Sequence, residues 1–111
     1  LEGLKADRPK FDYALTELNS VLPSMTDRDA PVAATVAAEI AHVLGKEAEF
    51  VASPGTYDQK HIDRIGKLKN CVAYGPGILE LAHKPDEYVG VDDMIDSAKV
   101  MARSLVKLLV G

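Results

Sequence analysis

The chain has 111 residues, which is enough for one domain or for part of a larger one but too few for two complete hydrophobic cores. Hydrophobic residues make up 47% and charged residues 27%, as in ordinary globular domains, which excludes collagen-like and intrinsically disordered chains. The net charge is -4 and the basic residues are scattered, which argues against a nucleic-acid-binding protein.

The segment before residue 30 is expected to contain the end of a helix, a strand and a loop. Residues 1–8 fit a helix end, because two leucines share a face and Pro9 disfavours continuation. Apolar residues then alternate with polar or small ones over residues 11–16, the period of a strand with one solvent-exposed face. Residues 19–29 have a loop composition and mark the expected domain boundary.

A helix is expected next, from Pro31 to Leu44. Asp29 is placed to cap its start, Pro31 suits a first turn, and Gly45 is a typical terminator. The apolar residues of this segment recur every three or four positions and define one core-facing stripe, formed by Val32, Val36, Ile40, Val43 and Leu44.

Two short strands with a short helix between them are expected in the middle of the chain. Residues 48–52 form an apolar run that suits a buried strand. Residues 57–65 carry isoleucines on one side and stop at Gly66, which favours a short helix. Residues 70–74 form a second apolar run, closed by a Gly-Pro-Gly sequence.

The chain is expected to end in an amphipathic helix after an irregular stretch. Asp92 and Asp93 lie at its positive end and Lys107 near its negative end, as the helix dipole favours. Its apolar stripe consists of Met94, Ala98, Met101, Leu105 and Leu108. The order of elements predicts an α/β fold, a partial mixed sheet covered by helices. So few strands do not make a self-sufficient sheet, so the core is expected to be incomplete.

His83 is the strongest candidate metal ligand among the three histidines. It lies in an irregular, proline-containing loop, and a histidine on a stiff loop suits metal binding or acid–base chemistry. Carboxylates near it, such as Glu87, are weaker candidates as its partners. His42 and His61 lie on expected helices and are more simply explained as boundary or solvated residues. From its spacing alone His83 also fits a solvated loop residue, because zinc needs three or four ligands.

The segment Gly55-Thr56-Tyr57-Asp58 joins an expected strand to an expected helix, so its free backbone N–H groups suit an anion such as a carboxylate. No glycine-rich nucleotide-binding pattern is present.

Cys71 lies within an expected strand, which favours a buried small residue over a nucleophile. A single cysteine forms no intrachain disulfide, so the cytoplasm is the expected compartment. No run of 18 apolar residues is present, so no membrane span is expected.

Three motifs, followed by the long terminal helix, resemble the carboxyl end of the acetylornithine deacetylase and succinyl-diaminopimelate desuccinylase family: Gly55-Thr56-Tyr57-Asp58, Tyr74-Gly75-Pro76-Gly77 and Ala82-His83-Lys84-Pro85-Asp86-Glu87-Tyr88-Val89. These are zinc-dependent amidohydrolases and peptidases related to the aminoacylases. The resemblance implies that residues 1–20 are the last helix and strand of a small lid, or dimerisation, domain. It implies that residues 21–111 are the last part of the zinc-hydrolase catalytic domain.

The same resemblance implies the roles of three residues. His83 matches the last ligand of a two-metal site, and Gly55 and Thr56 match residues that contact the substrate near its carboxylate. The metal is expected to be zinc, although imidazole and carboxylate ligands also accept cobalt or manganese. In that family the His-x-Asp motif, the bridging aspartate and the Glu-Glu pair with the general base all lie upstream of the segment that this chain resembles. The isolated chain is therefore expected to be inactive.

The expected function is that of a carboxyl-terminal fragment of a cytoplasmic, homodimeric hydrolase. Its substrate would be an N-acyl amino acid or a small peptide, and its partner the remainder of the parent chain. The alternative is a non-catalytic interaction or assembly module whose exposed apolar surfaces pair with another chain. In either case the chain alone is expected to be oligomeric, marginally stable or dependent on a partner.

Overall fold

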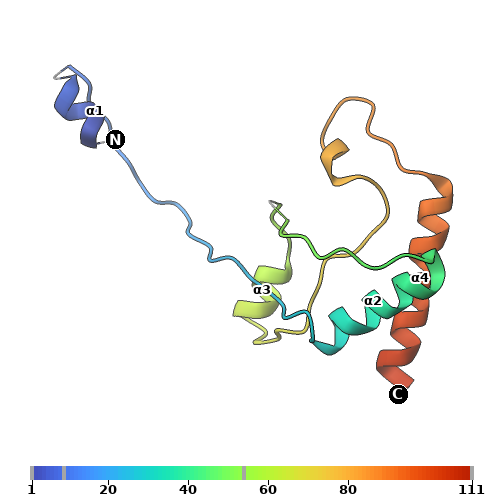
Figure 1. Ribbon diagram of the computed structural model, residues 1–111. Helices are drawn as coiled ribbons and strands as arrows, with labels where there is room; N and C mark the ends of the chain where they lie inside the picture. Colours follow the sequence, from blue (N-terminus) through green and yellow to red (C-terminus); the bar gives the residue numbers. More distant parts are fainter. Residues whose placement is uncertain (1, 9, 54, 111) are drawn as a thin grey trace.

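The computed structural model describes residues 2–8, 10–53 and 55–110. Its helices are joined by long segments without regular secondary structure (Figure 1). Four α-helices and one short 3-10 helix occur in this order: α1 Glu2–Asp7, α2 Pro31–Leu44, α3 Gln59–Arg64, η1 Leu79–Leu81 and α4 Val91–Val110. The helices expected from the sequence are thus confirmed within a few residues. Leu1 and Pro9, which entered the expectation for the first helix, lie outside the described residues.

The predicted sheet is wrong for the part of the chain that the structure describes. Residues 11–16, 48–52 and 70–74 were all expected to be strands, but none of them pairs into a ladder there. The physical reason is that a strand is stable only when a neighbour satisfies its backbone N–H and C=O groups. A two-residue period or an apolar run shows that the side chains suit a strand. It does not show that a second strand is available to pair with.

A local glycine ends helix α2, whereas a residue distant in sequence satisfies a backbone group at its start. Gly45 terminates it in the left-handed conformation, with φ 66°, and donates its N–H to the carbonyl of Ala41. At the start, Ala30 makes no side-chain cap. The Asn70 side chain instead accepts a 2.9 Å hydrogen bond from the N–H of Val32. The expected cap by Asp29 is therefore wrong, because a residue distant in sequence takes its place.

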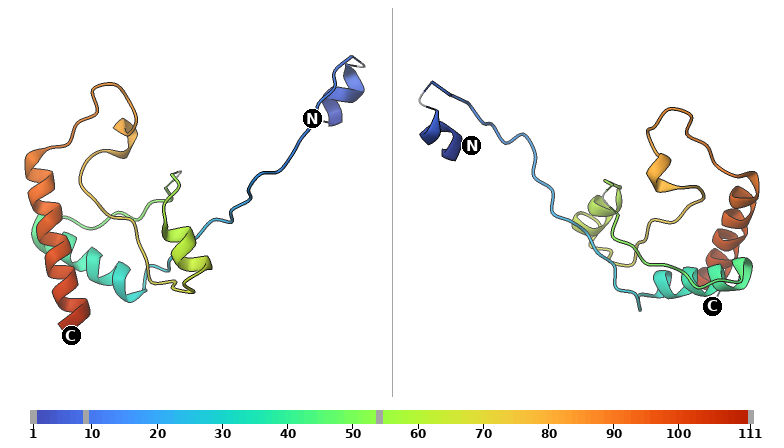
Figure 2. Two further views of the ribbon diagram at one scale, coloured as in Figure 1. Left: turned by 180° about the vertical axis from the view of Figure 1, so that it is seen from behind. Right: turned by 45° about the horizontal axis from the view of Figure 1, so that its top comes forward.

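Helices α2 and α4 pack against each other and carry the buried centre of the chain (Figure 2). The residues buried at this contact include Ala33 on α2, and Ser97, Val100 and Ser104, spaced three and four residues apart on α4. Small side chains allow two helix backbones to approach closely. The predicted apolar stripe of α4 lies elsewhere on the helix, with Met94 50% exposed and Leu105 56% exposed.

A buried carboxylate joins the two helices. Glu39 on α2 is 1% exposed. It accepts a hydrogen bond from Nε of Arg103 and forms an ion pair with Nζ of Lys107, both on α4. The hydrogen bond from Lys107, followed by that from Arg103, lowers the pKa of Glu39 against the opposing effect of burial. The negative charge is thus held between two positive ones.

We expect the contact between α2 and α4 to weaken in acid. The ordinary pKa of Glu39 is 4.5 and folding lowers it, so its ion pairs contribute stability above about that pH. This contribution is lost as the pH falls through the folded pKa. Unfolding free energy measured against pH should fall in this range for the wild-type chain and stay flatter for Glu39→Gln. Glu47→Gln, at an exposed position, is the control. Equal slopes for wild type and Glu39→Gln would contradict the assignment.

The chain is extended. Its radius of gyration is 19.9 Å and its extents are 63 × 37 × 20 Å, whereas a compact chain of similar length has a radius of about 13 Å. Its accessible surface is 9220 Å², against roughly 6,000 Å² for a compact monomer of this mass. An extended linker, residues 11–26, separates α1 from the other helices (Figure 1). The core is therefore incomplete, as the sequence predicted.

No helix within the described residues is long and apolar enough to cross a membrane.

Candidate functional site

The three residues singled out from the sequence lie in two loops. Gly55 and Thr56 form the turn that leads into α3, and His83 lies just after η1, in the stretch that leads to α4. Both loops extend to the same side of α2 in the views of Figures 1 and 2. No hydrogen bond or ion pair recorded for the described residues joins the two loops directly.

His83 is held by its backbone and presents its imidazole to solvent. The residue is exposed, and its φ is 63°, in the left-handed region that non-glycine residues rarely adopt. Asp86 is also left-handed, with φ 60°. The N–H of His83 donates a 3.0 Å hydrogen bond to Oε2 of Glu87. Glu87 therefore orients the main chain of the loop. It does not bond the imidazole, as the partner of a metal ligand would.

Two left-handed residues within four positions indicate a constrained loop. Each such residue costs on the order of 1–2 kcal/mol, so the surrounding contacts must hold it. The N–H of Lys84 donates to the carbonyl of Leu81 over 3.1 Å, which closes the turn that carries His83. The loop therefore presents an exposed imidazole from a restrained backbone.

One imidazole suits a divalent metal but does not make a site. No group of three or more His, Cys, Asp or Glu side chains is placed to hold a metal among the described residues. Catalytic zinc sites use three protein ligands and an open position. His83 fits the donor chemistry of one ligand, and the remaining ligands would have to come from other polypeptide.

The turn before α3 is closed by its own side chains. The Gly55 N–H donates a 3.1 Å hydrogen bond to Oγ of Ser53, which lies 2.9 Å from the Tyr57 hydroxyl. A Cβ on Gly55 would lie 3.1 Å from the Tyr57 hydroxyl oxygen and 3.3 Å from Oγ of Ser53. Such contacts are tight, so glycine suits this position. Gly55 and Thr56 are both exposed and accessible to a ligand.

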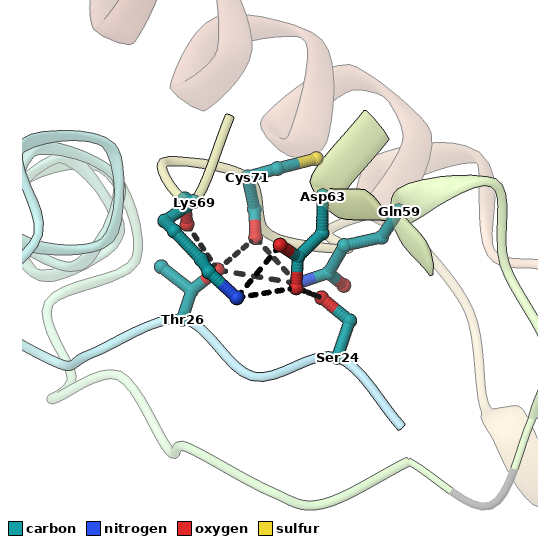
Figure 3. Close-up of polar contacts among 6 residues, drawn as sticks. All are labelled: Ser24, Thr26, Gln59, Asp63, Lys69 and Cys71. Atoms are coloured by element: carbon teal, nitrogen blue, oxygen red, sulfur yellow. Dashed lines mark hydrogen bonds and ion pairs between the residues drawn. The ribbon is translucent and has the colours of Figure 1, made fainter. Parts of the chain in front are cut away.

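A cluster of six residues, here called the polar clasp, includes the first residue of α3, Gln59 (Figure 3). Its members come from the linker, from α3 and from the segment after α3: Ser24, Thr26, Gln59, Asp63, Lys69 and Cys71. Gln59 donates from Nε2 to Oγ1 of Thr26 over 3.1 Å and to the carbonyl of Cys71 over 2.7 Å. The Thr26 hydroxyl in turn faces the carbonyls of Lys69, at 2.8 Å, and Cys71.

Asp63 is the charged centre of the polar clasp. It accepts a 2.8 Å hydrogen bond from the Ser24 hydroxyl and forms a 2.7 Å ion pair with Lys69. The hydrogen bond from Lys69 and then that from Ser24 lower the pKa of Asp63. The carboxylate is therefore negative at neutral pH and tied to two separate chain segments.

Sequence reasoning missed the polar clasp. The only local signal is the spacing of Gln59 and Asp63, which places both on one face of a helix. Their partners Ser24 and Thr26 are 33 to 39 residues away, and no local pattern encodes such a pairing. Cys71 takes part through its backbone carbonyl, and its thiol is free and half-buried. His42 and His61, expected to be a boundary residue and a solvated residue, are exposed residues of α2 and α3.

Comparison with known proteins gives one family match. The model of peptidase family M20/M25/M40 matches residues 1–107. A succinyl-diaminopimelate desuccinylase of Pseudoalteromonas atlantica is 34% identical over 103 residues, which cover 93% of this chain and 26% of that protein. A second desuccinylase, of Hydrogenovibrio crunogenus, is 30% identical over 115 residues, which cover 98% of this chain and 30% of the relative.

A further relative is a Bacillus subtilis protein named as a dipeptidase, YtjP, which is 30% identical over 101 residues, covering 87% of this chain and 20% of that protein. The chain therefore spans between 20% and 30% of the length of these relatives. No solved structure gives a significant match.

Proposed function

The chain belongs to peptidase family M20/M25/M40, and from this premise we propose that it is the carboxyl-terminal part of a longer metal-dependent hydrolase. Its substrate is proposed to be an N-acyl amino acid or a small peptide, cleaved at the amide bond. The observation that carries the proposal is the family match over residues 1–107. The desuccinylases and the dipeptidase among its relatives act, by their names, on such bonds.

Three residues of this chain have roles in the proposed reaction. The exposed imidazole of His83 serves as one ligand in a two-metal site, and its restrained loop fixes the backbone that carries the ring. Gly55 and Thr56 orient the substrate through its carboxylate end. The metal ions, zinc or alternatively cobalt or manganese, would polarise the scissile carbonyl and lower the pKa of water. The general base and the other ligands lie on the rest of the polypeptide, so the isolated chain is inactive.

The division of the chain is part of the same proposal. Residues 1–20 end a lid, or dimerisation, domain, and residues 21–111 complete the catalytic domain. The extended linker between α1 and α2 supports a boundary in this region. The parent enzyme is proposed to be a cytoplasmic homodimer.

The test is hydrolysis by the full-length protein. Metal-loaded and chelator-treated samples are assayed with N-succinyl and N-acetyl amino acids and with dipeptides, and release of free amino acid is measured. We expect metal-dependent hydrolysis of at least one substrate class and none by the isolated 111-residue chain. A metal-loaded full-length protein that cleaves none of them would refute the proposal and favour a non-catalytic assembly module.

A further inference from the structure

The polar clasp lies where three segments of the chain meet. Ser24 and Thr26 end the linker, Gln59 and Asp63 belong to α3, and the third segment contributes Lys69 and Cys71 (Figure 3). All six take part through hydrogen bonds or ion pairs rather than apolar packing. Such bonds have defined directions, so they fix the relative positions of the segments that they join.

Helix α3 needs this support. It has six residues, which is too short for a helix to be stable in water without tertiary contacts. None of its residues is fully buried, so α3 has no buried apolar anchor of its own. Gln59 and Asp63, one turn apart on the same face, supply its side-chain bonds to the linker. The polar clasp is therefore the attachment that sets where α3 lies.

The position of α3 determines the position of the turn before it. Thr56 precedes Gln59 by three residues, and Gln59 is the first residue of the helix. The turn is closed internally by Ser53 and Tyr57, so it moves as a unit with the start of α3. A displacement of Gln59 is therefore passed directly to Gly55 and Thr56.

We propose that Thr26 and Gln59 are positioning residues, which hold the Gly55-Thr56 turn where it binds the substrate. This inference rests on the proposed function of that turn. Thr26 is the centre of the arrangement, since its hydroxyl accepts a hydrogen bond from Gln59 and faces two carbonyls. Replacing the hydroxyl by a methyl group leaves the Gln59 amide without one of its two acceptors, while the side chain keeps its shape.

The test compares Thr26→Val with Thr26→Ser in the full-length protein. We expect Thr26→Val to raise KM for the hydrolysed substrate about 5- to 10-fold and to change kcat less than about 2-fold, because ground-state and transition-state binding weaken together. Thr26→Ser keeps the hydroxyl, so its KM should stay close to the wild-type value. Thr16→Val makes the same chemical change at an exposed linker position and should leave KM unaltered. Metal content should be equal in all four proteins.

Amide hydrogen exchange of residues 55–62, which include the bonded N–H groups of Gly55, His61 and Ile62, provides a readout independent of catalysis. Thr26→Val should speed exchange there, and Ser24→Ala, which removes one bond to Asp63, should do so more weakly. If Thr26→Val does not fold, the exchange measurement on Ser24→Ala replaces it as the test. An unchanged KM in Thr26→Val beside a raised KM in Thr56→Val would overturn the inference and leave the proposed function intact. If the wild-type protein cleaves no substrate, the proposed function fails, and unchanged exchange at residues 55–62 would overturn the positioning role as well.

Discussion

Replacing His83 in the full-length protein is expected to remove one of two bound metal ions and to lower kcat/KM by more than about 100-fold. The expectation follows from the proposed ligand role of the exposed imidazole, whose loop is restrained by the bond from its N–H to Glu87. The metal content of the purified variant, measured by elemental mass spectrometry, and the rate of amide hydrolysis are the two readouts.

The choice of variant matters because His83 is left-handed, with φ 63°. His83→Ala removes the imidazole but also strains a position that alanine tolerates poorly, whereas His83→Asn removes it with a residue that adopts this conformation readily. Equal losses in both variants would assign the effect to the imidazole and not to the backbone. His61→Ala, an exposed histidine of α3, is the control. Retention of both metal ions and of full activity in His83→Asn would refute the ligand assignment.

Replacing Val100 by aspartate is expected to lower the free energy of unfolding by roughly 3–5 kcal/mol, the typical effect of an uncompensated buried charge. Val100 has 0% exposure at the contact between α2 and α4. Arg103 and Lys107 of α4 already pair with the buried Glu39 carboxylate, so neither is a free partner for a second buried carboxylate. Denaturant unfolding of the variant and wild-type proteins measures the difference.

Lys99→Ala is the matched control for this substitution. Lys99 neighbours Val100 on α4, is exposed, and forms only a surface ion pair with Asp96, three residues away. Such pairs contribute about 0–1 kcal/mol, so the control should unfold close to wild type. A Val100→Asp protein with an unchanged unfolding midpoint would show that the α2–α4 contact does not contribute to the stability of the protein.

The helices were predictable because their signals are local. Pro31 and Gly45 delimit α2, and the acidic residues at the start of α4 together with Lys107 near its end match the helix dipole. The strands could not be predicted in the same way. The alternation over residues 11–16 shows that the side chains suit a sheet, but it does not show whether a hydrogen-bonding neighbour exists. The three motifs that contain Gly55, Gly75 and His83 indicated the family, which the match over residues 1–107 confirms.

The sequence by itself determined the helical segments, the incomplete core and the family, because periodicity, capping residues and short motifs are read along neighbouring positions. Only the tertiary structure decided which face of α4 meets α2, where small residues around Val100 are buried and the larger apolar stripe stays exposed. It alone revealed the cap of α2 by Asn70 and the polar clasp at Thr26. The bonds from Val32 to Asn70 and from Gln59 to Thr26 join residues 38 and 33 positions apart, and their energies depend on directions in space that no local pattern specifies.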